Sequence, residues 1–293
     1  MMIIANPRAG HGRGERSIRG LRDAIRRRGY DCTPVPTERP GHATELARRA
    51  AEANEPRLIV MGGDGTISEV VNGLVGSETE LGIVPMGTGN DVARSLGIPR
   101  GDLAGALDLA VQGETIPVDV GRERDRHFIS VLGVGFPAIV ADEANSFVRL
   151  HGSAAFFVAV YKALHRLRAF PFTLRLDDRT LEMEGVAVMI QNTPYTGGGL
   201  KMAPDARVDD GLLDVVVVDD IGRAGLMVNF PRAYTGRHLE HPSFSVHRAA
   251  RVAMETPEPM TKMFDGDLCG RTPLEADVVA GGVRIAVPPG SAA

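Results

Sequence analysis

The stretch Arg57–Leu74, RLIVMGGDGTISEVVNGL, constrains the fold of this chain more than any other part of its sequence. Residues 57–61 are mostly apolar and follow no period, which is typical of a strand that is buried on both faces. Three glycines then interrupt the run, namely Gly62, Gly63 and Gly65. Because glycine lacks a Cβ atom, such a turn lets another backbone or a ligand approach closely. The stretch therefore predicts a buried strand that ends in a glycine turn.

A helix is expected to follow this turn. Thr66 and Glu69 have the spacing of a capping box, and apolar residues recur at helical spacing as far as Leu74. A helix that starts there directs free backbone N–H groups and its positive dipole end toward one point, which favours polyphosphate binding. Asp64 would repel a phosphate unless its carboxylate binds a metal, accepts a proton or hydrogen-bonds the turn. A tight turn without any ligand is the plainer alternative.

Length and composition bound the classes of protein that need be considered. A chain of 293 residues favours two domains, and 43% hydrophobic with 24% charged residues is ordinary for a soluble globular protein. The net charge of −4 gives no basic field for nucleic acid, so no nucleic-acid partner is expected. Two cysteines form no metal or disulfide pattern, which favours the cytoplasm. No apolar stretch is long enough to cross a bilayer, so any membrane contact is expected to be peripheral.

The first part of the chain alternates between expected strands and helices. Strands are expected near residues 2–5, 30–36, 57–61 and 81–84, and helices near 15–28, 42–54, 66–74, 91–97 and 102–112. This alternation predicts a Rossmann-like parallel sheet with helices on both faces. Glycine loops at 6–14, 62–66 and 87–91 each follow a strand. Since ligands bind beyond the carboxyl ends of parallel strands, all three loops are expected at one edge of the sheet.

From about residue 119 the pattern changes to many short strands and few helices. The expected strands are 128–134, 172–176, 185–191, 213–218, 244–248, 252–255, 274–278 and 283–287. The expected helices follow Gly135 and lie near 153–168 and 223–233. We therefore predict an α/β domain at residues 1–118 and an antiparallel β-sandwich domain at residues 119–293.

Several motifs, taken together, resemble one family. The motifs are NPRAG at 6–10, GGDGT at 62–66 with Glu69, PMGTGND at 85–91, YTGGG at 195–199, APDA at 203–206, DGLLD at 210–214 and FDGD at 264–267. In this order they resemble the catalytic domain shared by diacylglycerol kinases, sphingosine kinases and bacterial lipid kinases. The resemblance covers nearly the whole chain. NAD kinases and phosphofructokinases share the glycine–aspartate turn, so the specificity comes from its combination with the later motifs.

The resemblance implies transfer of the ATP γ-phosphate to a lipid hydroxyl, with Mg²⁺, in a cleft between two domains. It also implies that the nucleotide is lined by Asn6, Thr37, Gly62, Gly63, Asp64, Gly65, Thr66, Gly87, Thr88 and Asn90. Asp64 would help to hold the metal and nucleotide. A second-domain Mg²⁺ would be bound by Asp210, the carbonyl of Leu212 and Asp214. Asp267 matches the proposed general base, although the family usually carries glutamate there and aspartate is one methylene shorter.

Phosphate neutralisation must differ from that of a P-loop enzyme, because the chain has no Gly-Lys-Ser/Thr motif and no lysine near a glycine loop. Backbone amides, arginines such as Arg8 and a metal would have to carry that charge. For residues 210–214 the alternative to a metal site is an Asp-Gly turn that leads into a strand. Both interpretations remain open from the sequence.

Two further patterns carry a structural and a functional interpretation. Arg16, Arg19, Arg22 and Arg26 recur near helical spacing, which is typical of a solvated helix face but also suits anionic headgroups. A second stripe is either core or the lining of a lipid pocket, with core the commoner meaning; it consists of Phe156, Phe157, Val160, Tyr161 and Leu164.

The favoured function is a peripheral, ATP- and Mg²⁺-dependent lipid kinase that meets its lipid substrate at the inner face of the membrane. Two alternatives remain at this stage: an NAD kinase-like enzyme, and a nucleotide-binding regulator without turnover. The sequence does not name the lipid, and it leaves open whether the chain is a monomer or a homodimer.

Overall fold

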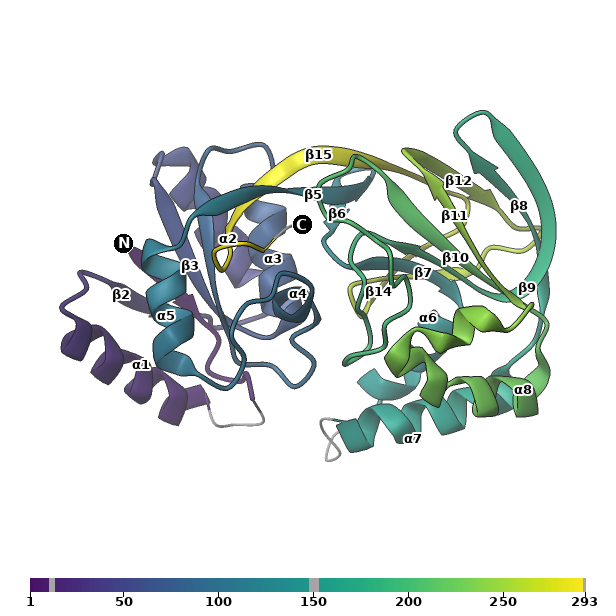
Figure 1. The fold of residues 1–293 in the computed structure, drawn as a ribbon, viewed down its shortest axis with the longest axis horizontal. Helices are drawn as coiled ribbons and strands as arrows, with labels where there is room; N and C mark the ends of the chain where they lie inside the picture. The colour runs from purple at the N-terminus through teal and green to yellow at the C-terminus, as the bar shows by residue number, and fades with distance from the viewer. Residues whose placement is uncertain (11–13, 148–152, 292–293) are drawn as a thin grey trace. The chain divides into compact units, whose positions relative to one another are not determined.

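The computed structural model describes residues 1–10, 14–147 and 153–291. The chain forms two compact units (Figure 1). Unit 1 contains residues 1–120 and 280–293, and unit 2 contains residues 121–279. No helix among the described residues is long and apolar enough to cross a membrane.

Unit 1 is built on four parallel strands in the order β4-β3-β1-β2. The strands are β1 (Met2–Ala5), β2 (Thr33–Pro36), β3 (Arg57–Gly62) and β4 (Glu80–Pro85). The helices between and after them are α1 (Gly14–Arg28), α2 (His42–Glu52), α3 (Asp64–Leu74), α4 (Asp91–Ser95) and α5 (Leu103–Gln112). The parallel sheet predicted from the alternating pattern is confirmed.

The core of unit 1 explains why its strands read as continuous apolar runs. In β3, Leu58 to Met61 are fully buried, since both faces of the strand are covered. α1 and α5 cover one face of the sheet (Figure 1), and Leu21 of α1 and Leu107 of α5 belong to the same buried cluster as Ile59. α2 and α3 pack against each other, and the Thr44 hydroxyl of α2 donates a hydrogen bond to the backbone carbonyl of Glu69 in α3.

Two long strands contribute to both units. β5 (Thr115–Glu123) and β15 (Leu274–Ala286) each begin in one unit and end in the other. Ile285 of β15 pairs with Leu81 of β4 in parallel, and the Gly281 N–H donates to the Asp119 carboxylate. The C-terminal residues 280–293 therefore belong to unit 1, whereas the sequence-based division assigned all of 119–293 to the second domain. The two expected strands at 274–278 and 283–287 are one strand.

Unit 2 is an antiparallel β-sandwich, as expected. Its other strands are β6 (Arg126–Phe128), β7 (Val131–Gly135), β8 (Phe170–Leu176), β9 (Arg179–Gln191), β10 (Leu213–Asp219), β11 (Phe244–Ala249), β12 (Arg251–Glu255), β13 (Thr261–Phe264) and β14 (Asp267–Arg271). All their recorded pairings are antiparallel. Neither β13 nor β14 is among the strands expected from the sequence.

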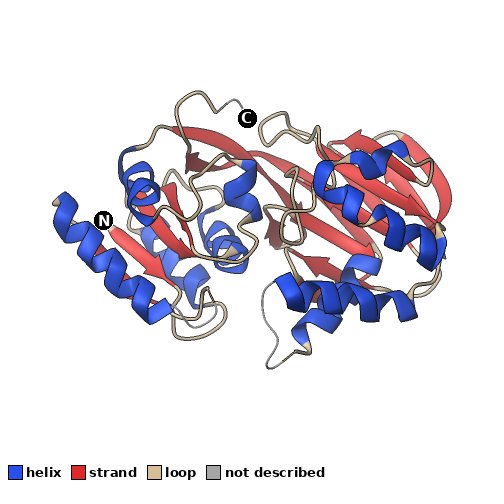
Figure 2. Cartoon of the chain, turned by 60° about the horizontal axis from the view of Figure 1, so that its bottom comes forward, coloured by secondary structure: helices blue, strands red, loops and turns tan. Residues whose placement is uncertain are grey.

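The helices of unit 2 gather on one face of its strands (Figure 2). They are α6 (Phe136–Asn145), α7 (Ser153–Ala163) and α8 (Gly222–Asn229), with short 3₁₀ segments η1 (Leu164–Arg166), η2 (Pro231–Thr235) and η3 (Arg237–Glu240). Side chains along β10 alternate between two cores: Val215 lies in the sandwich interior, and Val216 packs under the helices. Asp214 is two residues before Val216 on β10, so its side chain lies on the same face of the strand, the one covered by the helices.

The start of α3 differs from the expected capping box. The helix begins at Asp64, its N-cap is Gly63, and no side chain caps it. Thr66 is already inside the helix, where its hydroxyl accepts a hydrogen bond from Asn6. The Glu69 carboxylate accepts from the backbone N–H of Ala43 in α2 instead of turning back to its own helix end. The tertiary contacts of both side chains replace the local cap.

Candidate functional site

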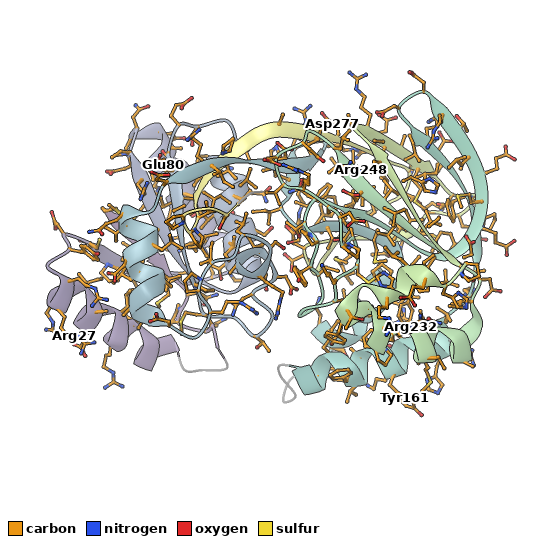
Figure 3. All side chains as sticks on the ribbon, in the orientation of Figure 1. Arg27, Glu80, Tyr161, Arg232, Arg248 and Asp277 are labelled. Atoms are coloured by element: carbon orange, nitrogen blue, oxygen red, sulfur yellow. The ribbon has the colours of Figure 1, made fainter. Side chains whose placement is uncertain are left out.

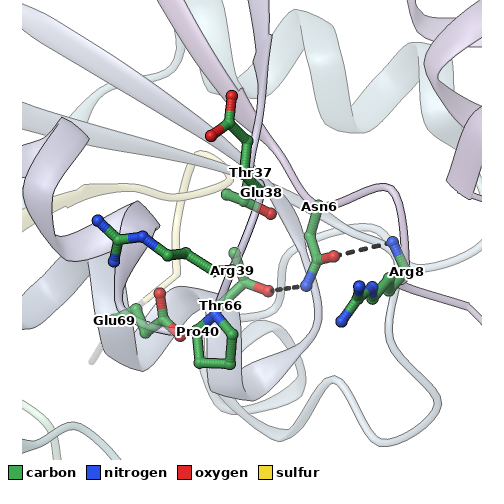
Figure 4. Close-up of a pocket in the computed structure, with 8 residues that line it drawn as sticks. All are labelled: Asn6, Arg8, Thr37, Glu38, Arg39, Pro40, Thr66 and Glu69. Atoms are coloured by element: carbon green, nitrogen blue, oxygen red, sulfur yellow. Dashed lines mark hydrogen bonds between the residues drawn. The ribbon is translucent and has the colours of Figure 1, made fainter.

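The carboxyl ends of β1, β3 and β4 lie at one edge of the parallel sheet, and the loops that follow them touch. The side-chain amide of Asn6 donates a 2.8 Å hydrogen bond to the Thr66 hydroxyl, and its Oδ1 atom accepts from the Arg8 N–H at 2.9 Å (Figure 4). A Cβ atom on Gly10 would lie 3.0 Å from the Met86 carbonyl oxygen. Residues 11–13 of the first glycine loop lie outside the described residues. The described ends of all three glycine loops meet at this edge.

The second and third glycine turns approach each other most closely at Gly63 and Gly87. A Cβ atom on Gly87 would lie 2.7 Å from the Gly63 Cα atom. Gly63 has φ −93°, so it is needed for the close approach and not for a left-handed backbone. Asn90 does adopt the left-handed conformation, at φ 49°. Its side chain accepts from the Gly87 N–H at 2.7 Å and donates to the Gly87 carbonyl at 2.9 Å, which fixes the third turn.

Asp64 lies at the first position of α3 and reaches the next turn along the sheet edge. Its carboxylate accepts a hydrogen bond from the backbone N–H of Val92 at 3.1 Å, near the start of α4. This bond ties the second glycine turn to α4, the next element along the sheet edge. The bond also places a carboxylate oxygen at the same edge as the three glycine loops.

A small pocket opens beside these loops (Figure 4). It encloses about 130 Å³ and is lined by Asn6, Arg8, Thr37, Glu38, Arg39, Pro40, Thr66 and Glu69. Ligand pockets usually enclose about 300–1,000 Å³, so this one suits a part of a nucleotide. Of the predicted nucleotide residues, Asn6, Thr37 and Thr66 line it; the glycines, Asp64, Thr88 and Asn90 do not.

Two arginines line this pocket. Arg8 follows the first strand, and Arg39 lies in the loop after β2. The Arg39 guanidinium pairs with the Glu45 carboxylate at 2.8 Å. Sequence reasoning named Arg8 as a phosphate-neutralising candidate but missed Arg39, whose place depends on the β2–β1 pairing.

Asp210, Leu212 and Asp214 lie together at the start of β10. The Asp210 carboxylate accepts from the Leu212 N–H at 3.1 Å, across Gly211 with its left-handed φ of 70°. The Asp-Gly turn that leads into a strand is therefore present. The Arg248 guanidinium contacts both carboxylates, bonding Asp210 and lying 3.5 Å from Asp214. The β10–β11 register places Arg248 directly opposite Asp214.

The Asp214 side chain is only 3% exposed, and its Oδ2 atom has no hydrogen-bond partner among the described residues. Burial raises the pKa of Asp214 to about 6; the Arg248 guanidinium opposes this rise, and the carboxylates of Asp210 and Asp205 add to it. Gln191, its cross-strand neighbour on β9, is fully buried with an unpartnered side-chain amide. A buried carboxylate oxygen without a donor is costly unless something else satisfies it.

The chemistry of this group fits Mg²⁺. Two carboxylates and a backbone carbonyl are hard oxygen ligands of the kind that Mg²⁺ takes. In the described part of the chain, no three His, Cys, Asp or Glu side chains cluster as a metal site. Arg248 already supplies a positive charge there and competes with a bound cation.

Phe264-Asp265-Gly266-Asp267 forms the hairpin between β13 and β14. Asp265 and Gly266 have φ values of 48° and 100°, as in a two-residue type I′ turn. The Asp265 carboxylate accepts from three backbone N–H groups, those of Ile129, Ser130 and Val131, at 2.9–3.0 Å. Asp265 is therefore an anchor between the hairpin and β7, a role that sequence reasoning missed although Asp-Gly is a strong hairpin signal.

Asp267 begins β14 and points into solvent. Its side chain is 75% exposed, and its Oδ2 atom lies 3.3 Å from the Arg126 guanidinium, which stacks over the Phe264 ring at 5.0 Å. An exposed carboxylate held by one arginine can accept a proton from an approaching hydroxyl group. Asp267 lies in unit 2, whereas Asp64 and the glycine loops lie in unit 1.

The structure also shows where the arginine stripe of α1 and the apolar stripe of residues 156–164 lie. On α1, Arg26 pairs with Asp23 and Arg28 with Asp108, while Arg19 and Arg22 are exposed. The side chain of Arg16 lies outside the described residues. Of the apolar stripe, Val160 of α7 and Leu164 of η1 are buried in the core, Phe156 is partly buried against it, and Phe157 and Tyr161 are exposed.

Comparison with known proteins gives consistent matches over the whole chain. A family model described as "Diacylglycerol kinase catalytic domain" matches residues 1–122, and one described as "YegS C-terminal NAD kinase beta sandwich-like domain" matches residues 130–287. A diacylglycerol kinase of Mycobacterium tuberculosis is 33% identical, covering 97% of this chain and 94% of the relative. One of Staphylococcus epidermidis is 31% identical over 92% of this chain and 86% of the relative.

Solved structures agree with these relatives. The crystal structure of a diacylglycerol kinase from Bacillus anthracis has a TM-score of 0.76 and 25% identity, covering 99% of this chain and 97% of that one. A second structure from the same organism has a TM-score of 0.81 and 27% identity, covering 99% and 98%.

Proposed function

The chain belongs to the diacylglycerol kinase family, and from this membership we propose that it transfers the γ-phosphate of ATP to the free hydroxyl group of a diacylglycerol-type lipid. The acceptor hydroxyl attacks the γ-phosphorus, the bond to the β-phosphate oxygen breaks, and ADP leaves. The products are ADP and a phosphorylated lipid. The lipid substrate would be met at the inner face of the membrane, from the cytoplasm.

The observation that carries this proposal is the meeting of three glycine loops at one edge of the parallel sheet. Phosphoryl transfer depends mainly on positioning and charge neutralisation. The N-terminal end of α3 directs its positive dipole end toward this edge, and Gly65 leaves open space beside it. Arg8 and Arg39 supply positive charge at the adjacent pocket. These features support ATP binding by backbone amides and arginine, without a P-loop lysine.

Mg²⁺ enters the proposal at two places. The ion that accompanies ATP would neutralise phosphate charge, and Asp64 is the carboxylate at the glycine-loop edge that would help to hold it. A second ion would be held by Asp210, the Leu212 carbonyl and Asp214. The Oδ2 atom of Asp214, which has no hydrogen-bond partner among the described residues, supports this second site. The turn before β10 is held by a hydrogen bond from the Leu212 N–H to the Asp210 carboxylate.

Asp267 is the proposed general base. It would take the proton of the lipid hydroxyl as the oxygen attacks, and Arg126 would hold the carboxylate in place. The exposure of Asp267 supports access by a hydroxyl group. The shorter aspartate side chain requires the acceptor to come closer to the backbone of β14 than it would for glutamate.

The proposal is tested with ATP labelled at the γ-phosphate and dioleoylglycerol in mixed micelles with Mg²⁺. The expected result is labelled phosphatidic acid, identified by chromatography and mass spectrometry. Parallel reactions contain sphingosine or NAD in place of dioleoylglycerol. Label in NADP would favour the NAD kinase-like alternative. Label in a sphingoid phosphate would show that the substrate is a sphingoid base and not a diacylglycerol. Tight ATP binding without transfer to any acceptor would favour the regulator.

A further inference from the structure

An apolar face remains exposed on the helices of unit 2. The side chains of Phe157 and Tyr161 on α7 are 50% and 60% exposed, and those of Met227 and Val228 on α8 are 55% and 69% exposed. Amphipathic helices normally turn such residues inward. Figure 3 shows the Tyr161 side chain at the outer side of α7, pointing away from the strands of unit 2.

Ring contacts join α7 to the segment that follows α8. Phe157 contacts the rings of Phe230 and Tyr234 at centroid distances of 6.2 and 6.4 Å. At the other end, the Arg223 guanidinium donates a hydrogen bond to the carbonyl of His165. α7 and α8 therefore run side by side in opposite directions (Figure 1). We call this surface the α7–α8 face; it consists of Phe157, Val158, Tyr161, Met227, Val228 and Tyr234. A contiguous apolar patch on a soluble protein marks an interaction site more often than chance exposure.

The charges around the face indicate its partner. Segments 153–168 and 222–240 contain six cationic residues, Lys162, Arg166, Arg168, Arg223, Arg232 and Arg237, and one acidic residue, Glu240, although the whole chain carries a net charge of −4. Glu240 pairs with Arg232 and Arg237, and acidic residues of α6 pair with Arg166 and Lys162. Cations outnumber acids even with these neighbours. Exposed aromatic and aliphatic side chains with a cationic rim suit an anionic lipid surface.

We propose that the α7–α8 face docks onto bilayers that contain anionic phospholipid. This inference rests on the proposed function, because a lipid kinase must reach a substrate that lies in the membrane. Apolar side chains would enter the headgroup region, while the rim would meet phosphate groups. A second copy of the chain fits the face less well, since an isologous dimer would bring two cationic rims together.

Vesicle co-sedimentation of the full chain tests the proposal. The probes are phosphatidylcholine vesicles and vesicles with 30 mol% phosphatidylglycerol, a composition of roughly the charge density of an anionic membrane leaflet. Wild type is expected to bind the phosphatidylglycerol vesicles, and a Tyr161→Ser/Met227→Ser/Val228→Ser variant is expected to bind more than about tenfold more weakly. Arg168→Gln should weaken binding about fivefold. Val246→Ser on β11 and Arg251→Gln on β12 are matched exposed controls that should bind like wild type.

Equal vesicle binding by wild type and the triple variant would overturn the docking surface, as would wild type that binds neither vesicle. Sedimentation velocity without lipid tests the alternative that a second copy of the chain binds the α7–α8 face. A wild-type dimer that the triple variant converts to monomer, with vesicle binding unchanged, would assign the face to a second copy and remove the proposal. Circular dichroism and thermal melting verify that each variant is folded, and the high exposure of the substituted side chains favours folding.

Activity separates docking from chemistry. The triple variant should phosphorylate dioctanoylglycerol, dispersed as monomer, like wild type, and should lose activity toward dioleoylglycerol in phosphatidylglycerol vesicles. Wild type that binds vesicles but phosphorylates neither lipid would contradict the proposed function and leave docking supported. Wild type that phosphorylates both lipids, with vesicle activity unaffected in the triple variant, would contradict docking and leave the proposed function supported.

Discussion

The backbones of Gly63 and Gly87 approach each other so closely that a Cβ atom on Gly63 would lie 3.1 Å from the Gly87 Cα atom. These residues belong to turns that follow adjacent parallel strands, β3 and β4. The contact holds two phosphate-binding candidates in one arrangement. It also explains a glycine at position 63, where the backbone itself has an ordinary φ of −93°.

Gly63→Val is therefore expected to push the two turns apart. The added side chain must displace the Gly87 backbone, so the second and third glycine turns lose their present arrangement. ATP affinity measured by calorimetry should fall at least about tenfold, and the melting temperature should also fall, because overpacking usually costs about 1–3 kcal/mol. An unchanged ATP affinity in the folded variant would remove Gly63 from the nucleotide site.

Gly65→Ala separates ligand approach from protein packing. Apart from its chain neighbours and the backbone of its own helix, no atom of the described residues lies within 4 Å of a Cβ atom placed on Gly65, which is in the first turn of α3. Alanine should stabilise the helix by about 0.5–1 kcal/mol relative to glycine. If phosphate approaches this position, ATP affinity should nevertheless fall. Gly20→Ala in α1, where the nearest atom would be at an ordinary 3.4 Å, is the control that should gain stability without losing ATP affinity.

Much of unit 1 can be predicted from sequence because its signals are local. Buried apolar runs, glycine turns and helical spacing lie within stretches of about ten residues, and parallel pairing then places the loops at one edge. The capping box at Thr66 and Glu69 failed since both side chains find partners on other elements, at Asn6 and Ala43. No local pattern announces those partners.

Unit 2 shows the opposite case. The pairing of Arg248 with Asp210 and Asp214 depends on the β10–β11 register across a long connection, which spacing does not reveal. The return of residues 280–293 to unit 1 likewise depends on a single long strand, β15. The β13–β14 hairpin was detectable, because Asp265-Gly266 is a strong type I′ turn signal. The motif at residues 264–267 was interpreted as a catalytic motif and not also as a turn.

Asp214→Ala tests the second Mg²⁺ site. Mg²⁺ that binds only the native state raises stability by mass action, by about 2.7 kcal/mol at a concentration of 100 Kd. The melting temperature of wild type should therefore rise on replacing chelator by Mg²⁺, and that of Asp214→Ala should rise less. Asp209→Ala is the matched control, since its exposed carboxylate pairs with Arg207. Arg248→Gln removes the competing cation and should enlarge the Mg²⁺ shift; identical shifts in all four proteins would argue against a metal there.

The pH dependence of stability should carry the signature of Asp214 in chelator. Burial raises its pKa to about 6, above the ordinary value of 3.8, so the folded state binds the proton more tightly than the unfolded chain. Its contribution is fully present below about pH 3.8 and is lost as pH rises through about 6, a change of roughly 3 kcal/mol. The stability of wild type minus that of Asp214→Asn, from urea unfolding, should fall across this window and stay flat above pH 7.

Mg²⁺ should reverse part of this loss above pH 6, because the ion binds the charged carboxylate. A stability difference between wild type and Asp214→Asn that does not change from pH 4 to pH 7 would show that Asp214 is not the buried titrating group. Measuring the difference between the two proteins cancels carboxylates whose pKa is lowered, such as Glu80 beside Thr115 and Arg57, which act in the opposite direction.

Asp267→Asn tests the proposed base. The substitution keeps size and removes basicity, so turnover with dioleoylglycerol should fall about 10²–10⁴-fold while ATP affinity stays nearly unchanged. Asp267→Glu should retain substantial activity if reach is the only difference from the family pattern. Steady-state kinetics in mixed micelles and calorimetry with ATP provide the two measurements.

Arg126→Gln distinguishes proton transfer from positioning. Arg126 contacts the Asp267 carboxylate at 3.3 Å and stacks on Phe264, so its loss should free the carboxylate without removing it. We expect a smaller loss of turnover than in Asp267→Asn, because the carboxylate that would accept the proton is still present. Near-normal turnover in Asp267→Asn would move the base elsewhere. Asp64 would then be the next candidate, since its carboxylate already lies at the glycine-loop edge beside the Val92 N–H.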